Sequence, residues 1–139
     1  MKYVLDTNTV SFLMRGDEAV AARLARRPRT EVLIPQPVVA EIEYGLARLP
    51  RSNRRTRLRK RFSVLLAEMI RADWTDAVSL SFGEIKADLE SRGVRLEDFD
   101  VAIAAHAVAY EGTLVTDNLS QMTRIEGLRV ENWRGSSTA

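Results

Sequence analysis

The sequence predicts a three-layer α/β/α sandwich with a central parallel sheet. Short apolar runs alternate along the chain with longer stretches whose apolar residues recur at helical spacing. The runs are apolar throughout rather than alternating with polar residues, which is typical of strands covered on both faces of a parallel sheet. We expect one domain over residues 1–134 and a disordered tail over residues 135–139.

The N-terminal third predicts two strands, each followed by a helix. Residues 3–5 form an apolar run that ends at Asp-Thr-Asn, so a strand leads into a helix N-terminus there. Residues 17–26 have helical spacing, and residues 31–34 form the second strand. Pro35 and Pro37 then mark a helix start, because proline is tolerated in the first helical turn.

The remaining elements follow the same alternation. The helix that begins near Pro37 runs towards Gly45 or Leu49, and Pro50 and Ser52 end it. We expect a basic amphipathic helix to about residue 70, a short strand at 71–74, helices at 76–91 and 97–110, and strands at 113–116 and 128–130. Gly93 suits the C-terminal end of the helix over residues 76–91. The helix over 97–110 is apolar nearly all round, which indicates burial.

Composition excludes several classes of protein. The chain has 139 residues, 45% of them hydrophobic and 29% charged, which is typical of one globular domain and not of a disordered chain. It has no cysteine, which excludes disulfides, thiolate metal sites and cysteine nucleophiles. Asp6 leaves no room for the apolar stretch of a signal peptide, and no run is long enough to span a bilayer. We therefore expect a cytoplasmic protein without membrane contact.

The charge is unevenly distributed. The net charge is only +2, yet one stretch without acidic residues carries eight basic ones: Arg48, Arg51, Arg54, Arg55, Arg57, Arg59, Lys60 and Arg61. This asymmetry suits a nucleic-acid backbone as partner. A solvated helix face is the alternative interpretation of the same run.

Two aspartates follow predicted strands directly. Asp6 and Asp117 each come at a strand end, and the carboxyl ends of parallel strands meet at the same edge of the sheet, where sites form. Either could instead be a helix N-cap, because aspartate is a preferred capping residue, and Asn118 could cap the same helix as Asp117.

Asp100 is the acid for which a purely structural role is the weakest explanation. On a helix it shares a face with Ile103, Ala104 and Ala107, and no lysine or arginine lies within helical reach on that face. A carboxylate buried there costs several kcal/mol unless it is paired, protonated or bound to a metal. Asp98 lies roughly 200° away around the helix and is expected at the surface.

Glu41 shares a helix face with Gly45. Glycine inside a helix costs about 1 kcal/mol relative to alanine, so Gly45 indicates close approach by another element. Glu43 lies off this face and is expected in solvent. Four clustered carboxylates, Asp6, Glu41, Asp100 and Asp117, stay ionised together only if a cation neutralises them. Oxygen ligands alone favour Mg²⁺ or Mn²⁺ over zinc, and such ions assist in-line attack on a phosphoryl group.

Four short segments around these acids resemble the motifs of PIN domains. In chain order they are Leu5-Asp6-Thr7-Asn8, then Val39-Ala40-Glu41-Ile42 with Gly45, then Asp100 with Ile103-Ala104-Ala105, then Thr116-Asp117-Asn118. The closing residues 127–133 are similar to the end of VapC-type toxins within that group. The resemblance covers almost the whole chain. Its one departure is that Leu119 and Met122 stand where an aromatic residue often follows the last acid.

The resemblance implies an activity and partners. It implies an α/β/α fold and Mg²⁺- or Mn²⁺-dependent endoribonuclease activity. It also implies that the chain is a toxin, neutralised by a cognate antitoxin that enters the acidic cleft, and that it forms a homodimer within a larger toxin–antitoxin assembly. By motif match, Asp6, Glu41, Asp100 and Asp117 would be the catalytic and metal-binding acids. Asn8, Thr116 and Asn118 match accessory polar positions near the site.

The basic stretch offers a second hypothesis. Arg48, Arg51, Arg54, Arg55 and Arg57 are expected to contact the RNA backbone or the antitoxin. The chain could then be a non-enzymatic nucleic-acid or antitoxin-binding module that uses residues 48–61.

A strand followed by Asp6-Thr7-Asn8 also resembles haloacid-dehalogenase phosphatases. Those enzymes need a second aspartate where this chain has Asn8 and a later lysine motif that is not evident here. His106, the single histidine, is expected to be structural, and Trp74 and Trp133 are expected to be buried in the core or an interface rather than to stack on RNA.

Overall fold

The computed structural model describes residues 1–135, and its strands form one five-stranded parallel sheet. The strands are β1 Tyr3–Leu5, β2 Val32–Pro35, β3 Ile70–Ala72, β4 Thr113–Val115 and β5 Arg129–Glu131. All of β1, β2 and β4 are buried, as expected for strands covered on both faces. Of the expected disordered tail, 135–139, only Gly135 belongs to the described residues.

The sheet order β3-β2-β1-β4-β5 creates a switch point between β1 and β4. From β1 the chain moves outward through β2 and β3, and then it returns to the other side of β1 to form β4 and β5. Neighbouring connections diverge at such a point and leave a crevice beyond the carboxyl ends of the strands. Leu5 pairs with Val115 there, at the last residue of each strand.

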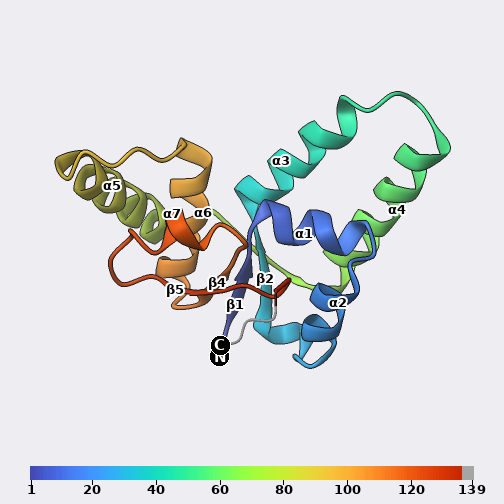
Figure 1. The fold of residues 1–139 in the computed structure, drawn as a ribbon, viewed down its shortest axis with the longest axis horizontal. Coiled ribbons are helices and arrows are strands. Elements are labelled where there is room, and N and C mark those ends of the chain that lie inside the picture. Colours follow the sequence, from blue (N-terminus) through green and yellow to red (C-terminus); the bar gives the residue numbers. More distant parts are fainter. Residues whose placement is uncertain (136–139) are drawn as a thin grey trace.

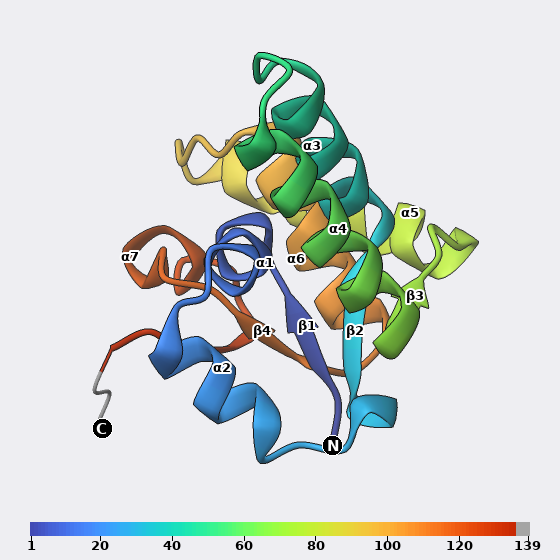
Figure 2. The ribbon, with the colours of Figure 1, turned by 90° about the vertical axis from the view of Figure 1, so that its right-hand side faces the viewer.

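Helices cover both faces of the sheet, which confirms the predicted three-layer fold. They are α1 Thr7–Met14, α2 Glu18–Ala25, α3 Gln36–Ala47, α4 Asn53–Glu68, α5 Asp76–Ser91, α6 Asp98–Ala109 and α7 Leu119–Met122. In Figure 1, α5 and α6 lie to the left of the sheet, while α1, α2 and α4 lie to its right. Figure 2 shows α3 and α4 side by side, rising beyond the ends of the strands.

Side-chain caps explain where several helices begin. Asp6, Asp17, Ser52 and Thr75 each accept a hydrogen bond from a backbone N–H three residues later, and thereby start α1, α2, α4 and α5. The predicted helices and strands agree with the structure to within a few residues. The 3₁₀ turn at Arg29–Glu31 was not predicted, and only the candidate caps Asp117 and Asn118 indicated α7, because both elements are too short to have a recognisable period.

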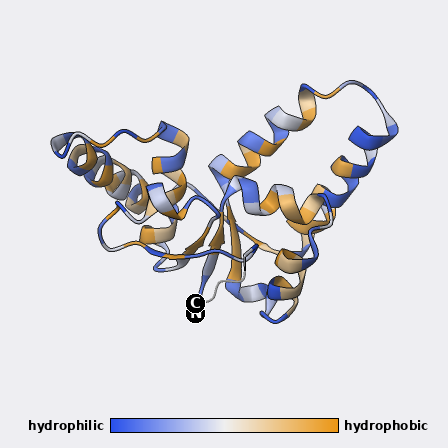
Figure 3. Ribbon diagram, in the orientation of Figure 1, coloured by the Kyte–Doolittle hydropathy of each residue, from blue (hydrophilic) through white to orange (hydrophobic). Residues whose placement is uncertain are grey.

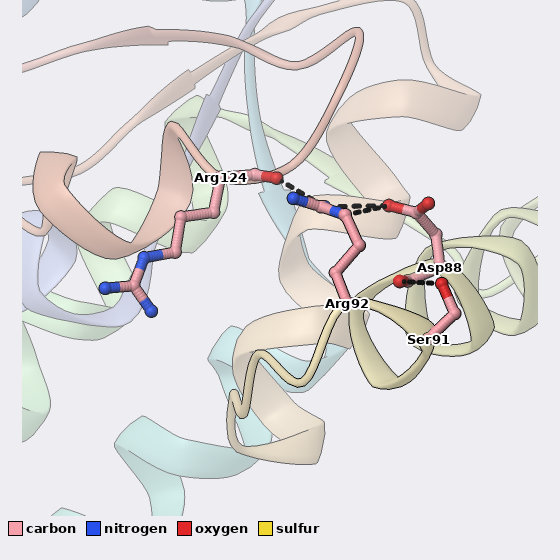
Figure 4. Close-up of polar contacts among 4 residues, drawn as sticks. All are labelled: Asp88, Ser91, Arg92 and Arg124. Atoms are coloured by element: carbon pink, nitrogen blue, oxygen red, sulfur yellow. Dashed lines mark hydrogen bonds and ion pairs between the residues drawn. The ribbon is translucent and has the colours of Figure 1, made fainter.

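The helix α6 is the buried helix that the sequence predicts. Residues 101–107 are all buried, and α6 packs against α5, α3 and the strands β1 and β4. The end of α5 is held to the segment after α7, as Figure 4 shows. There the Arg92 guanidinium donates to Asp88 and to the backbone carbonyl of Arg124, both at 2.7 Å. These contacts fix the position from which the loop into α6 departs.

Apolar residues fill the sheet and its flanks, while α4 begins in a hydrophilic stretch (Figure 3). Trp133 is 1% exposed and packs against Tyr3, as expected. Trp74 is 46% exposed, so the expectation that it lies in the core is wrong. Its burial in an interface stays a prediction. Within residues 1–135, no helix has the length and apolar character needed to cross a bilayer.

Candidate active site

Asp6 stands directly beyond β1 and has the dual character that the sequence leaves open. Its Oδ1 accepts the N–H of Thr9 at 2.8 Å, so the residue is the N-cap of α1. Its own N–H donates to the carbonyl of Val115 at 3.1 Å, which joins the site to β4. Burial raises the pKa of Asp6, hydrogen bonds from Thr116 and Thr9 oppose this, and the negative charge of Asp117 adds to it. Capping and function therefore do not exclude each other here.

The segment after β4 supplies Asp117 and its polar neighbours. Asp117 is exposed, and its Oδ1 accepts a hydrogen bond from Asn8 Nδ2 at 3.3 Å. Thr116 is fully buried, lies near enough to Asp6 to lower the pKa of that carboxyl, and accepts the N–H of Asn118 at 2.9 Å. The Asn118 amide donates to Gln121 Oε1 at 2.7 Å. Of the three accessory positions, Asn8 thus joins the start of α1 to the segment after β4, whereas Asn118 forms its hydrogen bonds within that segment.

Glu41 reaches the site from α3. The hydroxyl of Thr7, the first residue of α1, donates to Glu41 Oε1 and ties the two helices together. Thr7 was not among the predicted site residues, although its position directly after Asp6 was a usable signal. The prediction that Gly45 marks close approach by another element is wrong. No other element lies within 4 Å of the place that a Cβ atom would take there. Gly45 leaves open space beside Glu41 instead.

Asp100 enters the site in the first turn of α6. Burial raises its pKa, and the negative charges of Glu41, Asp6 and Glu97 raise it further. Asp98 points elsewhere, as predicted, and pairs with Lys86 at 2.9 Å. Glu43 likewise lies outside the cluster, in an ion pair with Arg59. The fold therefore brings Asp6, Glu41 and Asp100 within electrostatic reach of one another, whereas Glu43 and Asp98 pair with basic groups at the surface.

The chemistry of this donor set suits a hard divalent cation. Among residues 1–135, none of Asp6, Glu41, Asp100 and Asp117 forms an ion pair with a basic group, so their mutual repulsion is uncompensated. Carboxylate oxygens are ligands that Mg²⁺ and Mn²⁺ accept. In that same part of the chain, no three acidic or histidine side chains are gathered closely enough to hold one ion. The ligand types fit, and as they stand the four side chains do not form a closed coordination shell.

Two clefts meet at Glu41. The larger, of about 960 Å³, runs between α3 and the start of α6 and includes Glu90, Glu97 and Asp98. The smaller, of about 280 Å³, lies between α1, α3 and α4 and includes Arg15, Arg48 and Arg54. Glu41 and Tyr44 belong to both. Of the four candidate acids, Glu41 is the one that lines these clefts, so a chain lying along either cleft would pass Glu41.

The basic stretch is divided by the fold. Arg48 and Arg54 line the smaller cleft, whereas Arg51, Arg55 and Arg57 line neither cleft. Two further members have structural partners: Arg59 pairs with Glu43, and Arg61 donates to the carbonyl of Met14 at 2.9 Å.

His106 is structural, as expected from its place on the buried helix. It is fully buried, and its Nδ1 lies 2.7 Å from the carbonyl oxygen of Ala102. Burial lowers the pKa of His106, and the bond to Ala102 opposes this. The ring packs between Trp74 and Tyr110.

Comparison with known proteins gives matches over nearly the full chain. Residues 3–127 match the PIN domain family. Ribonuclease VapC2 of Rickettsia felis is 28% identical over 135 residues, which cover 96% of this chain and 98% of that protein. The tRNA(fMet)-specific endonuclease VapC of Salmonella typhimurium is 26% identical over 133 residues, with coverage of 96% and 98%.

VapBC complexes are among the solved structures with the same fold. The chain matches VapBC2 of Rickettsia felis, solved with a DNA fragment from its promoter, with a TM-score of 0.86 and 28% identity; the match covers 96% of this chain and 99% of that one. It matches DNA-bound VapBC of Salmonella typhimurium with a TM-score of 0.86 and 27% identity, with coverage of 96% and 98%.

Proposed function

The chain belongs to the PIN domain family, and from this premise we propose that it is an endoribonuclease toxin of the VapC kind. The observation that carries the proposal is that, within residues 1–135, carboxylates without ion-pair partners accumulate around the β1–β4 switch point, where burial first and then acidic neighbours raise the pKa of Asp100. A full-length match to VapC ribonucleases supports the same assignment.

In this proposal the acids hold Mg²⁺ or Mn²⁺. Asp6, Glu41, Asp100 and Asp117 would supply the ligands, and the ion would contribute charge neutralisation at the scissile phosphate. The protein positions these groups before substrate arrives. Thr7 holds Glu41 by a hydrogen bond, Asn8 holds Asp117, and the cap of α1 fixes Asp6. Such outer contacts orient ligands and raise their affinity for a metal.

The substrate is RNA, and the basic α3–α4 region binds its backbone. Arg48, Arg51, Arg54, Arg55 and Arg57 belong to no ion pair within the part of the chain that the structure describes. Each phosphate contact on single-stranded RNA contributes about 0.7 to the salt slope of binding. Charge reversal of Arg54, Arg55 and Arg57 should reduce that slope. An unchanged slope would identify them as a solvated face.

A cognate antitoxin is the second proposed partner, since the matched structures are VapBC complexes. It would occupy the acidic cleft and so exclude RNA. We further propose that the toxin is a homodimer within the larger assembly. Sedimentation of the toxin alone and with the product of the neighbouring reading frame measures both.

A cleavage assay with matched variants tests the activity. Total RNA is incubated with the protein and Mg²⁺ or Mn²⁺, and a chelator serves as the metal-free control. Glu41→Gln and Asp100→Asn should abolish cleavage and growth inhibition. Glu43→Gln and Asp98→Asn make the same chemical change on the same helices at acids that pair with Arg59 and Lys86, and should leave both intact.

If cleavage survives Asp100→Asn and Glu41→Gln, the enzyme hypothesis fails and a non-enzymatic binding module replaces it. Loss of cleavage in all four variants would also contradict the assignment, because the effect would then not be specific to Glu41 and Asp100.

A further inference from the structure

An exposed aromatic side chain stands at the ridge between the two clefts. Tyr44 is 66% exposed and lies one helical turn after Glu41 on α3, so the two side chains share a face of the helix. It lines both clefts, whereas most large apolar side chains of α3 are buried. Core packing therefore does not explain a ring at this position.

A guanidinium already covers one side of that ring. The Cζ atom of Arg48 lies 5.5 Å from the centre of the Tyr44 ring, one further turn along α3. Arg48 takes part in no ion pair among residues 1–135. Gly45, beside Tyr44, opens onto free space and adds no side chain that would crowd the ring. The aromatic ring and the cation thus lie together on the α3 surface next to Glu41.

The two clefts differ in charge on either side of this unit. The smaller cleft carries three arginines, Arg15, Arg48 and Arg54, against the single acid Glu41. The larger cleft carries two basic residues, Lys86 and Arg95, against four acids. A phosphate chain is attracted to the first surface and repelled by the second, unless a cation intervenes. The backbone of a bound RNA therefore belongs on the α4 side of Tyr44.

An aromatic ring combined with an arginine-lined groove suits unpaired bases. Every base has a face that stacks on an aromatic ring, and these faces are free only in single strands, loops and bulges. In a duplex the base faces are covered by their neighbours. A tyrosine beside the acids would thus select an unpaired nucleotide next to the bond that is cut.

We propose that Tyr44 stacks on an unpaired base of the RNA substrate beside the scissile phosphate, and that Arg48 contacts the adjoining phosphate on the α4 side. This inference rests on the proposed ribonuclease function and deepens it. Tyr44 is then a substrate-binding residue that makes the site specific for single-stranded RNA, and the acids provide the chemistry.

Binding is measured in an inert background so that cleavage does not interfere. Each substitution is made in the Asp100→Asn protein and titrated with a fluorescein-labelled single-stranded RNA of mixed sequence. Tyr44→Ala should raise the Kd by about 5- to 150-fold, which corresponds to about 1–3 kcal/mol of stacking. Tyr44→Phe keeps the ring and should bind within a few-fold of the parent. Arg48→Gln should lower the salt slope by about 0.7.

The control removes similar exposed apolar area elsewhere. Leu80 is 65% exposed on α5 and lines neither cleft, so Leu80→Ala should not change the Kd. A fully paired duplex of the same sequence should bind more weakly, and Tyr44→Ala should not change its affinity. A duplex that loses affinity in parallel with the single strand would overturn the inference.

Cleavage by the otherwise unchanged protein separates this inference from the proposed function. If the protein cuts RNA and Tyr44→Ala leaves KM, kcat and Kd unchanged, the stacking proposal is wrong and the ribonuclease assignment stands. If no RNA is cut under any metal condition, the assignment itself fails. If Tyr44→Ala instead weakens self-association or antitoxin binding without changing RNA affinity, Tyr44 is a protein contact and the inference is overturned.

Discussion

The carboxylate of Asp6 caps α1 and is proposed to bind the metal ion, and different substitutions separate these two roles. Its Oδ1 caps α1 by accepting the N–H of Thr9, and asparagine caps a helix about as well as aspartate, whereas alanine does not. Burial raises the pKa of Asp6, so the ionised group also destabilises the folded state. Asp6→Asn removes the charge and keeps the cap. Asp6→Ala removes both.

The expected difference follows from the cap and the size of the chain. Loss of an N-cap costs about 1 kcal/mol, within a range of about 0.5–2 kcal/mol. An unfolding entropy of about 2.1 cal/mol/K per residue gives about 0.29 kcal/mol/K for 139 residues, so 1 kcal/mol corresponds to about 3 °C. In chelator at neutral pH, Asp6→Ala should melt about 3 °C below Asp6→Asn. Asp6→Asn should melt at or above the unsubstituted protein.

Scanning calorimetry and the RNA cleavage assay measure the two tasks independently. The cleavage rate of both variants should fall by more than about 10- to 100-fold, which is the usual effect of removing a side chain that only orients a metal ligand. Equal melting temperatures for the asparagine and alanine variants would refute the capping argument. Near-normal cleavage by Asp6→Asn would refute the role of Asp6 as a ligand, whatever the melting temperatures.

Three further predictions concern the surroundings of the site. Trp133→Ala should lower the free energy of unfolding by about 3–5 kcal/mol, because the side chain is fully packed; urea titration measures this. Thr7→Val should lower kcat more than it raises KM, because Glu41 loses the donor that orients it; steady-state cleavage kinetics measure the split. Burial lowers the pKa of His106, so the unfolded chain binds the proton first as pH falls below about 6.5, and stability should decrease there. His106→Gln should flatten the dependence of unfolding free energy on pH, measured by urea titration between about pH 6.5 and 5. An unchanged dependence would show that His106 does not cause it.

The sequence could predict most of the fold because its signals are local. Continuous apolar runs identify buried strands, and capping residues such as Asp6 and Thr75 identify helix starts without knowledge of the rest of the chain. Asp100 could be singled out by the same local reasoning, since helical spacing places it on an apolar face. What made it conspicuous in the sequence is also what raises its pKa in the structure.

The remainder depended on how helices far apart in sequence meet. The hydrogen bond from Thr7 to Glu41 joins residues 34 positions apart, and no local pattern indicates it. Gly45 was misjudged because a small residue signals either close approach or open space, and only the packing of α1 and α4 around α3 decides which. Local sequence could thus indicate the candidate acids but not the clefts that meet at Glu41.

The cost of the acid cluster yields a test that links stability to function at Asp100. Its negative charge is disfavoured by burial and by Glu41, Asp6 and Glu97, so Asp100→Asn should raise the melting temperature in chelator. A divalent cation reverses the order: at 100 times its Kd it stabilises the unsubstituted protein by about 2.7 kcal/mol, or about 9 °C for a chain of this size. The asparagine variant should gain little.

Asp98→Asn, at the paired surface acid two residues earlier, provides the control and should keep the full cation-induced shift. The ranking of the Asp100→Asn variant and the unsubstituted protein therefore inverts when metal is added, which neither a purely structural acid nor an incidental surface charge would produce. If both proteins shift equally with Mg²⁺ and with Mn²⁺, the cation binds elsewhere. The repulsion around Asp100 would then have to be explained by a basic partner, and the antitoxin would be the first protein to test.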